Sequence, residues 1–271
     1  MDFERRLKNM ELGLRDKPVL VMSASSGIGK GVAIEFAKEK ARVMLFSRSE
    51  EKLKKTRDEI VELTGAQVEY TVGDMRNAED IERVVERTVE VYGSIYALFN
   101  NTGGPPAGRF DDFDDDAWLD AFNLTLRAYV RSIRAVLPIM RKAGTGRIVN
   151  NTSSSIRQVI DNLILSNAFR TGIMGLSKTL ARELAGENIL VNVVGAGRIA
   201  TERLNYLDSI KAKEVGTSLE EYQKRFASTI PIGRYGKAEE LAKLVVFLCS
   251  EANTYITGQS ILVDGGIVMA Y

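Results

Sequence analysis

The sequence contains no histidine, and this absence excludes more chemistry than any other feature of its composition. Without histidine there can be no Ser-His-Asp triad and no Cys-His nucleophile pair. The chain also has a single cysteine, Cys249. A zinc site would therefore need an unusual ligand set made mostly of oxygen atoms, and we expect no metal site. Any proton transfer must use tyrosine, lysine, a carboxylate, a hydroxyl relay or water.

The chain also has almost no net charge and no long apolar runs. Its 37 basic and 36 acidic residues give a formal charge of +1, which gives no indication of a nucleic-acid partner. The apolar runs are short and interrupted by charge, so we expect no membrane-spanning segment. The N-terminal residues carry charges of both signs and do not resemble a secretory signal. A lone cysteine forms no internal disulfide, which fits the reducing cytoplasm.

Short apolar runs alternate with helical patterns along the chain. Strands are predicted near residues 18–22, 41–46, 67–72, 95–99, 147–150, 188–194 and 260–263. This alternation predicts a doubly wound, Rossmann-type α/β fold, with a parallel sheet of about seven strands and helices on both faces. We expect an N-terminal arm over residues 1–12 and a single dinucleotide-binding domain over residues 13–271. A long polar insertion at about residues 200–230 is typical of a substrate lid.

Small residues follow the first predicted strand, at the edge where ligands of such folds bind. Residues 23–29 read Ser-Ala-Ser-Ser-Gly-Ile-Gly, and a helical pattern comes directly after them. Glycines there allow backbone N–H groups to approach a pyrophosphate at the start of the helix. The same pattern also occurs in tight turns that bind nothing.

A second candidate region spans residues 146–184, which predict a buried strand, a serine-rich turn and a long helix. Ser166 and Arg170 are four residues apart, so they lie one turn apart on one helix face. The strand would bring the hydroxyl groups of residues 152–155 beside that face. Four hydroxyl groups next to a fixed cation indicate either a functional site or a site that has lost its function.

Together these motifs resemble the short-chain dehydrogenase/reductase family, most closely its β-ketoacyl carrier-protein reductase branch, over residues 13–266. The family's Thr-Gly-x-x-x-Gly-x-Gly corresponds to residues 22–29 and its Asn-Asn-Ala-Gly to residues 100–103, with departures at Met22, Ser23 and Thr102. The resemblance implies that a nucleotide cofactor is held by residues from several motifs. These are Ser23, Ser25, Ser26, Gly27, Ile28, Gly29, Asp74, Met75, Asn101, Thr102, Gly103, Arg170, Ile199 and Thr201.

The resemblance also implies catalytic roles. Ser153 corresponds to the serine that bonds the substrate carbonyl, and Asn123 is expected to hold a water of the proton relay. The family's Tyr-x-x-x-Lys falls on Ser166 and Arg170. A serine hydroxyl is a much weaker acid than a phenol, and arginine, with a pKa above ~12, cannot release a proton. We therefore expect the residues that bind the cofactor to match those of the family, and the residues that transfer the proton to differ from them.

The end of the second predicted strand bears on the choice of cofactor. It carries no acid of the kind that NAD-binding folds use to bond the ribose hydroxyls. Arg48 lies there instead, and a guanidinium suits a 2′-phosphate, so NADP(H) is expected over NAD(H). A solvated surface arginine would give the same pattern. Near the predicted lid, Arg198 is a candidate contact for an anionic substrate and Tyr206 a candidate replacement acid.

Three hypotheses about function remain open. The leading one is an NADP(H)-dependent carbonyl or 3-oxoacyl reductase, acting on a small-molecule carbonyl or alcohol, whose proton comes through a Ser153, Ser166 and water relay or from Tyr206. The second is an NADP(H)-binding protein without hydride chemistry, serving as a sensor or partner subunit. The third is a lyase or isomerase that uses the same pocket. The resemblance also implies a homotetramer.

Overall fold

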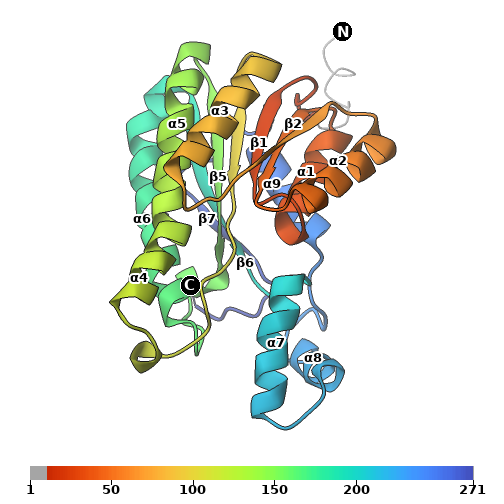
Figure 1. Ribbon diagram of the computed structural model, residues 1–271, viewed down its shortest axis with the longest axis vertical. Coiled ribbons are helices and arrows are strands. Elements are labelled where there is room, and N and C mark those ends of the chain that lie inside the picture. The colour runs from red at the N-terminus through yellow and green to blue at the C-terminus, as the bar shows by residue number, and fades with distance from the viewer. Residues whose placement is uncertain (1–10, 271) are drawn as a thin grey trace, which may run out of the picture.

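The computed structural model describes residues 11–270, and within that range the chain forms a seven-stranded sheet with helices on both faces (Figure 1). All paired strands are parallel, and their order is β3-β2-β1-β4-β5-β6-β7. The strands are β1 (Pro18–Met22), β2 (Arg42–Ser47), β3 (Val68–Val72), β4 (Ala97–Asn100), β5 (Gly146–Ser153), β6 (Ile189–Ala196) and β7 (Ser260–Val263). The predicted doubly wound fold is confirmed.

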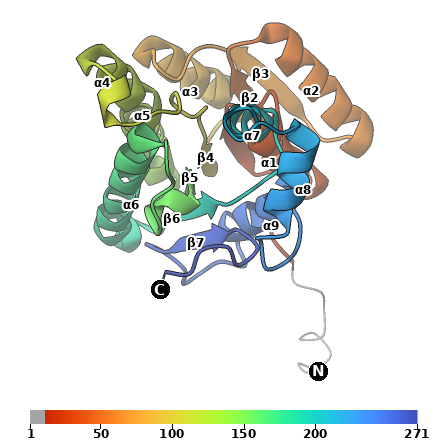
Figure 2. The ribbon, with the colours of Figure 1, turned by 90° about the horizontal axis from the view of Figure 1, so that it is seen from below.

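Helices connect the strands and cover the sheet. They are α1 (Gly27–Lys38), α2 (Glu50–Thr64), α3 (Ala78–Tyr92), α4 (Asp115–Phe122), α5 (Ala128–Ala143), α6 (Ile164–Leu184), α7 (Glu202–Glu214), α8 (Leu219–Ala227) and α9 (Ala238–Leu248). Figure 2 shows α3, α5 and α6 on one side of the sheet and α1, α2 and α9 on the other. Of the N-terminal arm predicted for residues 1–12, residues 1–10 lie outside the described part of the chain.

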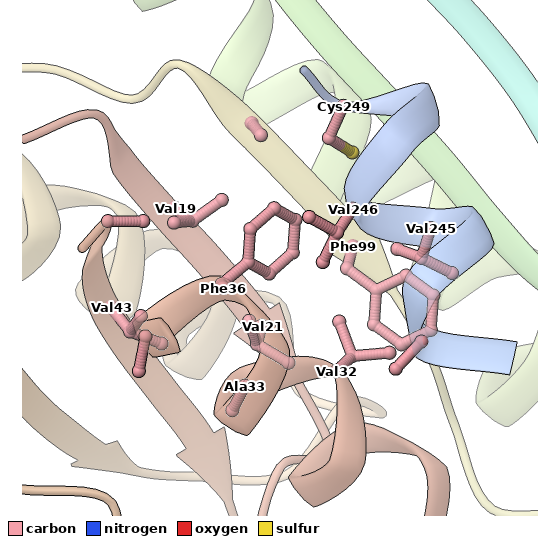
Figure 3. Packing of buried hydrophobic residues seen from close by; sticks show 14 of the residues in the cluster. Val19, Val21, Val32, Ala33, Phe36, Val43, Phe99, Val245, Val246 and Cys249 are labelled. Carbon is pink, nitrogen blue, oxygen red and sulfur yellow. The ribbon is translucent and has the colours of Figure 1, made fainter. Parts of the chain in front are cut away.

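Apolar residues of the central strands are buried on both sides because helices cover both faces. Alternate side chains of a strand point to opposite faces. Val19 and Val21 of β1 accordingly pack in one cluster with Phe36 of α1 and Val246 of α9 (Figure 3). Leu20 of the same strand belongs to the cluster on the opposite face. This double burial explains why β1 reads as a continuous apolar run.

The helical pattern near residues 115–142 is divided in the structure. α4 ends at Phe122, a π-helical segment covers Asn123–Arg127, and α5 follows. Thr125 in this segment is fully buried, and its hydroxyl donates to the main-chain oxygen of Ala121. A hydroxyl bonded in this way bends a helix, and an inserted π turn changes which residues face inward.

The strands all end at one edge of the sheet, because they are parallel. α7 and α8 lie together beyond this edge and stand out from the rest of the molecule (Figure 1). They form the region predicted as a lid at about residues 200–230. None of the described helices combines the length and the apolar character that crossing a bilayer requires. The carboxyl edge and the two helices beyond it therefore define where a ligand can bind.

Replacement of Phe36 by alanine tests the packing of the core in Figure 3. The Phe36 side chain is fully buried, so we expect Phe36→Ala to lower the free energy of unfolding by roughly 3–5 kcal/mol. Leu63 of α2 is 64% exposed, and Leu63→Ala is the matched control, with an expected loss within about 0.5 kcal/mol. Urea denaturation measures both. Equal losses for the two variants would contradict the proposed core.

Candidate active site

A cavity of about 330 Å³ lies at the carboxyl edge of the sheet. The ends of β1, β4, β5 and β6 contribute to it, together with α6 and the first turn of α7. It brings together most of the residues predicted from the sequence. These are Ser23, Ser26, Gly27, Ile28, Asn101, Thr102, Gly103, Ser153, Ser166, Arg170, Ile199 and Thr201.

The turn between β1 and α1 adopts the tight conformation expected for pyrophosphate binding. A Cβ atom on Gly29 would lie 2.2 Å from the main-chain oxygen of Ser23, so only glycine fits there. Gly27 has a φ of 55° and lies against Thr201, whose methyl group would be 3.2 Å from an added Cβ. The start of α1 and the residue that begins the lid therefore meet at one wall of the cavity.

Asparagine side chains form a hydrogen-bonded ladder below the cavity. Asn100 of β4 donates to the side-chain oxygen of Asn150 of β5 at 2.8 Å. One residue further along, Asn151 donates to the side-chain oxygen of Asn101 at 2.9 Å. This ladder gives partners to most of the buried amide groups of these four residues, Asn151 Oδ1 excepted, and unpaired amides would be costly. It also fixes the strand ends at the cavity floor.

Ser166 and Arg170 lie in direct contact, as their spacing predicts. Arg170 Nε donates to Ser166 Oγ at 3.1 Å, and both side chains are only 7% exposed. The guanidinium also donates to the main-chain oxygen of Asn151 at 3.4 Å, and this oxygen accepts a second hydrogen bond from the buried Tyr129 hydroxyl at 2.7 Å. Burial raises the pKa of Tyr129, although the nearby Arg170 charge opposes this shift. The phenol is therefore a neutral donor that holds the strand end.

The hydroxyl groups of Ser153 and Ser166 both accept hydrogen bonds within the protein. Ser153 Oγ accepts from the main-chain N–H of Ser155 at 3.2 Å, and Ser166 Oγ accepts from Arg170. Each hydroxyl proton thus remains free to be donated toward the cavity. The arrangement provides O–H donors beside a fixed cation.

Asn123 has a hydrogen-bond partner within its own helical segment. It begins the π-helical segment, and its amide oxygen accepts a hydrogen bond from Arg127 at 3.1 Å. Asn123 is not among the residues that line the cavity. The water-holding role expected for Asn123 therefore stays a prediction.

Arg198 and Tyr206 are also not among the cavity-lining residues. Arg198 donates to Asp208 at 2.6 Å and lies 3.8 Å from the ring centroid of Phe226, so its charge is used inside the lid. Tyr206 is 54% exposed. Arg203, which the sequence interpretation did not select, lines the cavity instead. The sequence contains no pattern that distinguishes Arg203 from Arg198, which is five residues away. The packing of α7 decides which side of this helix faces the cavity.

The remaining predicted cofactor residues lie around the ends of β2 and β3, outside the cavity lining. Ser25 and Ser47 share a hydrogen bond of 2.8 Å. Arg48 is exposed and has no ion-pair partner among residues 11–270. Asp74 accepts from the main-chain N–H of Arg76 at 2.9 Å, and Met75 is buried. Arg48 is thus available for a ligand, whereas Asp74 is partly used by its own turn.

The cavity is polar enough to hold a nucleotide. Thr102 Oγ1 and Asn151 Oδ1 are buried and have no hydrogen-bond partner among the described residues, and both residues line the cavity. Buried polar groups in proteins are normally satisfied. These two atoms, with the narrow turn before α1, fit a dinucleotide that bonds to them.

The chain is similar to known proteins along nearly its whole length. Residues 22–268 match the family described as enoyl-(acyl carrier protein) reductase. The 3-oxoacyl-[acyl-carrier-protein] reductase of Thermotoga maritima is 36% identical over 258 residues, which cover 94% of this chain and 99% of that protein. The chain belongs to the short-chain dehydrogenase/reductase family.

Two further proteins are similar to this chain over most of its length, one in structure and one in sequence. The crystal structure of L-sorbose reductase from Gluconobacter frateurii, complexed with NADPH and L-sorbose, superposes with a TM-score of 0.92. That match has 32% sequence identity and covers 97% of this chain and 100% of the other. The NADPH-dependent reductase BacG of Bacillus subtilis is 30% identical over 251 residues, which cover 92% of this chain and 97% of that protein.

Ser23 is a departure from the family motif with a measurable cost. It has a φ of 50°, in the left-handed region where glycine is favoured over residues with a Cβ atom. We expect Ser23→Gly to raise the free energy of unfolding by roughly 0.5–1 kcal/mol, measured by urea denaturation. Ser26→Gly is the matched control, because Ser26 has a φ of −165°, an extended conformation open to any residue. A gain in the control, or a loss at Ser23, would contradict the assigned strain.

Proposed function

We propose that this protein is an NADP(H)-dependent carbonyl reductase in which Ser166 and Arg170 replace the family's tyrosine and lysine. One observation carries the proposal. Arg170 donates to Ser166 Oγ at 3.1 Å inside the cavity, beside Ser153. A serine that accepts from a cation keeps its own proton for a ligand. The fixed charge also stabilises negative charge that develops on a nearby oxygen.

Residues from four strand ends would hold the cofactor. The start of α1 suits the pyrophosphate because its N–H groups and dipole attract negative charge. Thr102 and Asn151 offer unpaired polar atoms for the nicotinamide riboside. Arg48, exposed at the end of β2 where no acid is present, suits a 2′-phosphate. When bound, NADPH supplies a hydride to the substrate carbonyl carbon.

The residues of the chain supply the other half of the reaction. Ser153 and Ser166 donate hydrogen bonds to the carbonyl oxygen and polarise it. Arg170 stabilises the negative charge on that oxygen but keeps its own protons. The proton that completes the alcohol must therefore come from water through a hydroxyl group. This route lacks a low-pKa phenol, so the proton step is expected to limit the rate.

The first test removes the Ser153 hydroxyl. We expect Ser153→Ala to lower kcat by roughly 10²–10³-fold, the usual loss when one oxyanion donor is removed. The dissociation constant for NADPH, measured by its fluorescence, should stay unchanged. Ser228→Ala, at an exposed position at the end of α8, is the matched control. Unchanged turnover in Ser153→Ala would contradict the assigned role.

The second test concerns the cofactor. Arg48→Glu should raise the dissociation constant of NADPH by roughly 10–100-fold, because a charge-assisted contact is replaced by repulsion. Binding of NADH, which lacks the 2′-phosphate, should not weaken. Arg87→Glu, at an exposed position of α3, controls for net charge. An equal loss of affinity for NADPH and NADH would show that Arg48 does not contact the 2′-phosphate.

A second function has one observation in its favour. The cavity lining contains no tyrosine, lysine or aspartate, and its one acid, Glu202, is exposed. This composition suits a protein that binds NADP(H) without hydride transfer. Tight NADPH binding without consumption against ketones and β-ketoacyl thioesters would establish it. If the double variant Ser166→Tyr and Arg170→Lys then had reductase activity, the wild type would lack only the proton donor that the family's tyrosine supplies.

The assembly proposed for this protein is a homotetramer. An apolar groove between α5 and α6 is lined by Val130, Leu137, Leu176 and Leu180. Such a surface suits contact with a second copy. Light scattering should give a mass near four times the 30.0 kDa of one chain.

A further inference from the structure

Two guanidinium groups line the same cavity. Arg170 projects from α6 and Arg203 from the first turn of α7, and both line the cavity. Neither forms an ion pair with an acid among residues 11–270. Many other arginines of the protein do form ion pairs with acidic residues, as Arg198 does with Asp208. The cavity therefore carries positive charge that the described residues do not neutralise.

Arg203 is held in a defined position by main-chain contacts. Its NH2 group donates to the main-chain oxygen of Pro105 at 2.5 Å. The guanidinium lies flat against Gly104, where an added Cβ atom would be 3.0 Å from NH2 and 3.1 Å from Nε. The centroid of the Tyr206 ring lies 5.5 Å from the guanidinium carbon. These contacts leave Nε and NH1 without a hydrogen-bond partner among the described residues.

The charge around Arg203 is unfavourable without a ligand. Burial lowers the pKa of Arg203, and the neighbouring Arg170 charge lowers it further. The one acid in the cavity lining, Glu202, does not compensate, because its side chain is 76% exposed and lies 3.5 Å from Lys52. Two like charges in a partly buried site are stabilised by an anion between or beside them.

The phosphates of the cofactor have other positions available. The start of α1, where Gly27 lies against Thr201, suits the pyrophosphate. The 2′-phosphate suits Arg48, which is exposed at the end of β2. Arg203 instead lies against Gly104 and Pro105, beyond the end of β4. Its unused donors thus remain for a second ligand.

We infer that the substrate is a small carbonyl compound that also carries an anionic group, a carboxylate or a phosphate, and that Arg203 binds this group. The inference rests on the proposed reductase function, since Ser153, Ser166 and Arg170 polarise the carbonyl of the same molecule. The cavity of about 330 Å³ would also hold part of the cofactor, so the space left beside Arg203 suits only a small substrate.

The reaction balances without a further reactant. The carbonyl carbon gains a hydride from NADPH, and the carbonyl oxygen gains a proton from water through a serine hydroxyl. The products are the alcohol, NADP⁺ and a hydroxide that buffer neutralises. The anionic group forms no covalent bond and keeps its charge, so its binding energy serves to orient the carbonyl.

The experiment compares matched substrates with and without the charge. The pairs are 3-oxobutanoate with its methyl ester, and dihydroxyacetone phosphate with dihydroxyacetone. We expect kcat/KM to be roughly 10–100-fold higher for at least one anion than for its neutral partner, the usual contribution of a charge-assisted contact. Which pair shows the difference tells a carboxylate from a phosphate. Equal kcat/KM within both pairs would overturn the inference.

Variants then locate the contact. Arg203→Met should abolish the preference for the anion, and Arg203→Lys should retain part of it. Gly104→Ala should reduce it as well, because the added methyl group displaces the guanidinium. Arg225→Met, at an exposed position of α8, should leave it unchanged. A higher KM for NADPH in Arg203→Met with the preference intact would overturn the inference and assign Arg203 to the cofactor.

A binding measurement separates this inference from the proposed function. NADP⁺ and either anionic ketone are both oxidised, so they form a complex that cannot react. Calorimetry should show one of the two anions binding to the NADP⁺ complex of the wild type and not to that of Arg203→Met. Such binding without turnover of any substrate would keep the anion site and refute the reductase. Absence of binding by both anions would refute the anion site.

Discussion

The contacts of one guanidinium hold this active site together. Arg170 of α6 donates to Ser166 Oγ and to the main-chain oxygen of Asn151, and so it ties the helix to the end of β5. Its partners are a hydroxyl and a carbonyl group rather than a carboxylate, which leaves its positive charge unneutralised by the described residues. A buried charge of this kind acts more strongly on a ligand than the same charge in water. Because arginine does not release its proton, the site has lasting electrostatic attraction and no acid of its own.

The position of that charge depends on the polar interior beneath it. Asn100 and Asn150 bond each other across β4 and β5, and Asn101 and Asn151 repeat the pairing at the cavity. The buried Tyr129 hydroxyl adds a second donor to the Asn151 carbonyl. A fully satisfied polar network is rigid, whereas a partly satisfied one is costly. Asn151 Oδ1 and the nearby Thr102 Oγ1 have no partner among the described residues, and both residues line the cavity, so the network ends where we propose that a cofactor binds.

The two arginines at the region predicted as a lid have different surroundings, because Arg198 pairs with Asp208 and Arg203 lines the cavity. Arg198, Asp208 and Tyr235 form the interior of this region, where the carboxylate accepts from both side chains. Burial, with a smaller contribution from Asp208, raises the pKa of Tyr235 to about 12, so this phenol stays a neutral donor. Arg203 lies on the side of α7 that meets the cavity. This region therefore presents one cation to the cavity, while Asp208 pairs with the other.

The parallel sheet could be predicted from the amino-acid sequence, because the alternation of apolar strands and amphipathic helices permits few other arrangements. The sequence also determined the contact of Ser166 with Arg170, since residues four apart on a helix must be neighbours. It did not determine the places of Asn123, Arg198 and Arg203. The π-helical segment changes the phase of the helix at Asn123, and long-range packing against Asp208 and Phe226 sets the side of the lid that Arg198 occupies. Local spacing contains no information about such contacts, so the sequence does not show that Arg203, and not Arg198, lines the cavity.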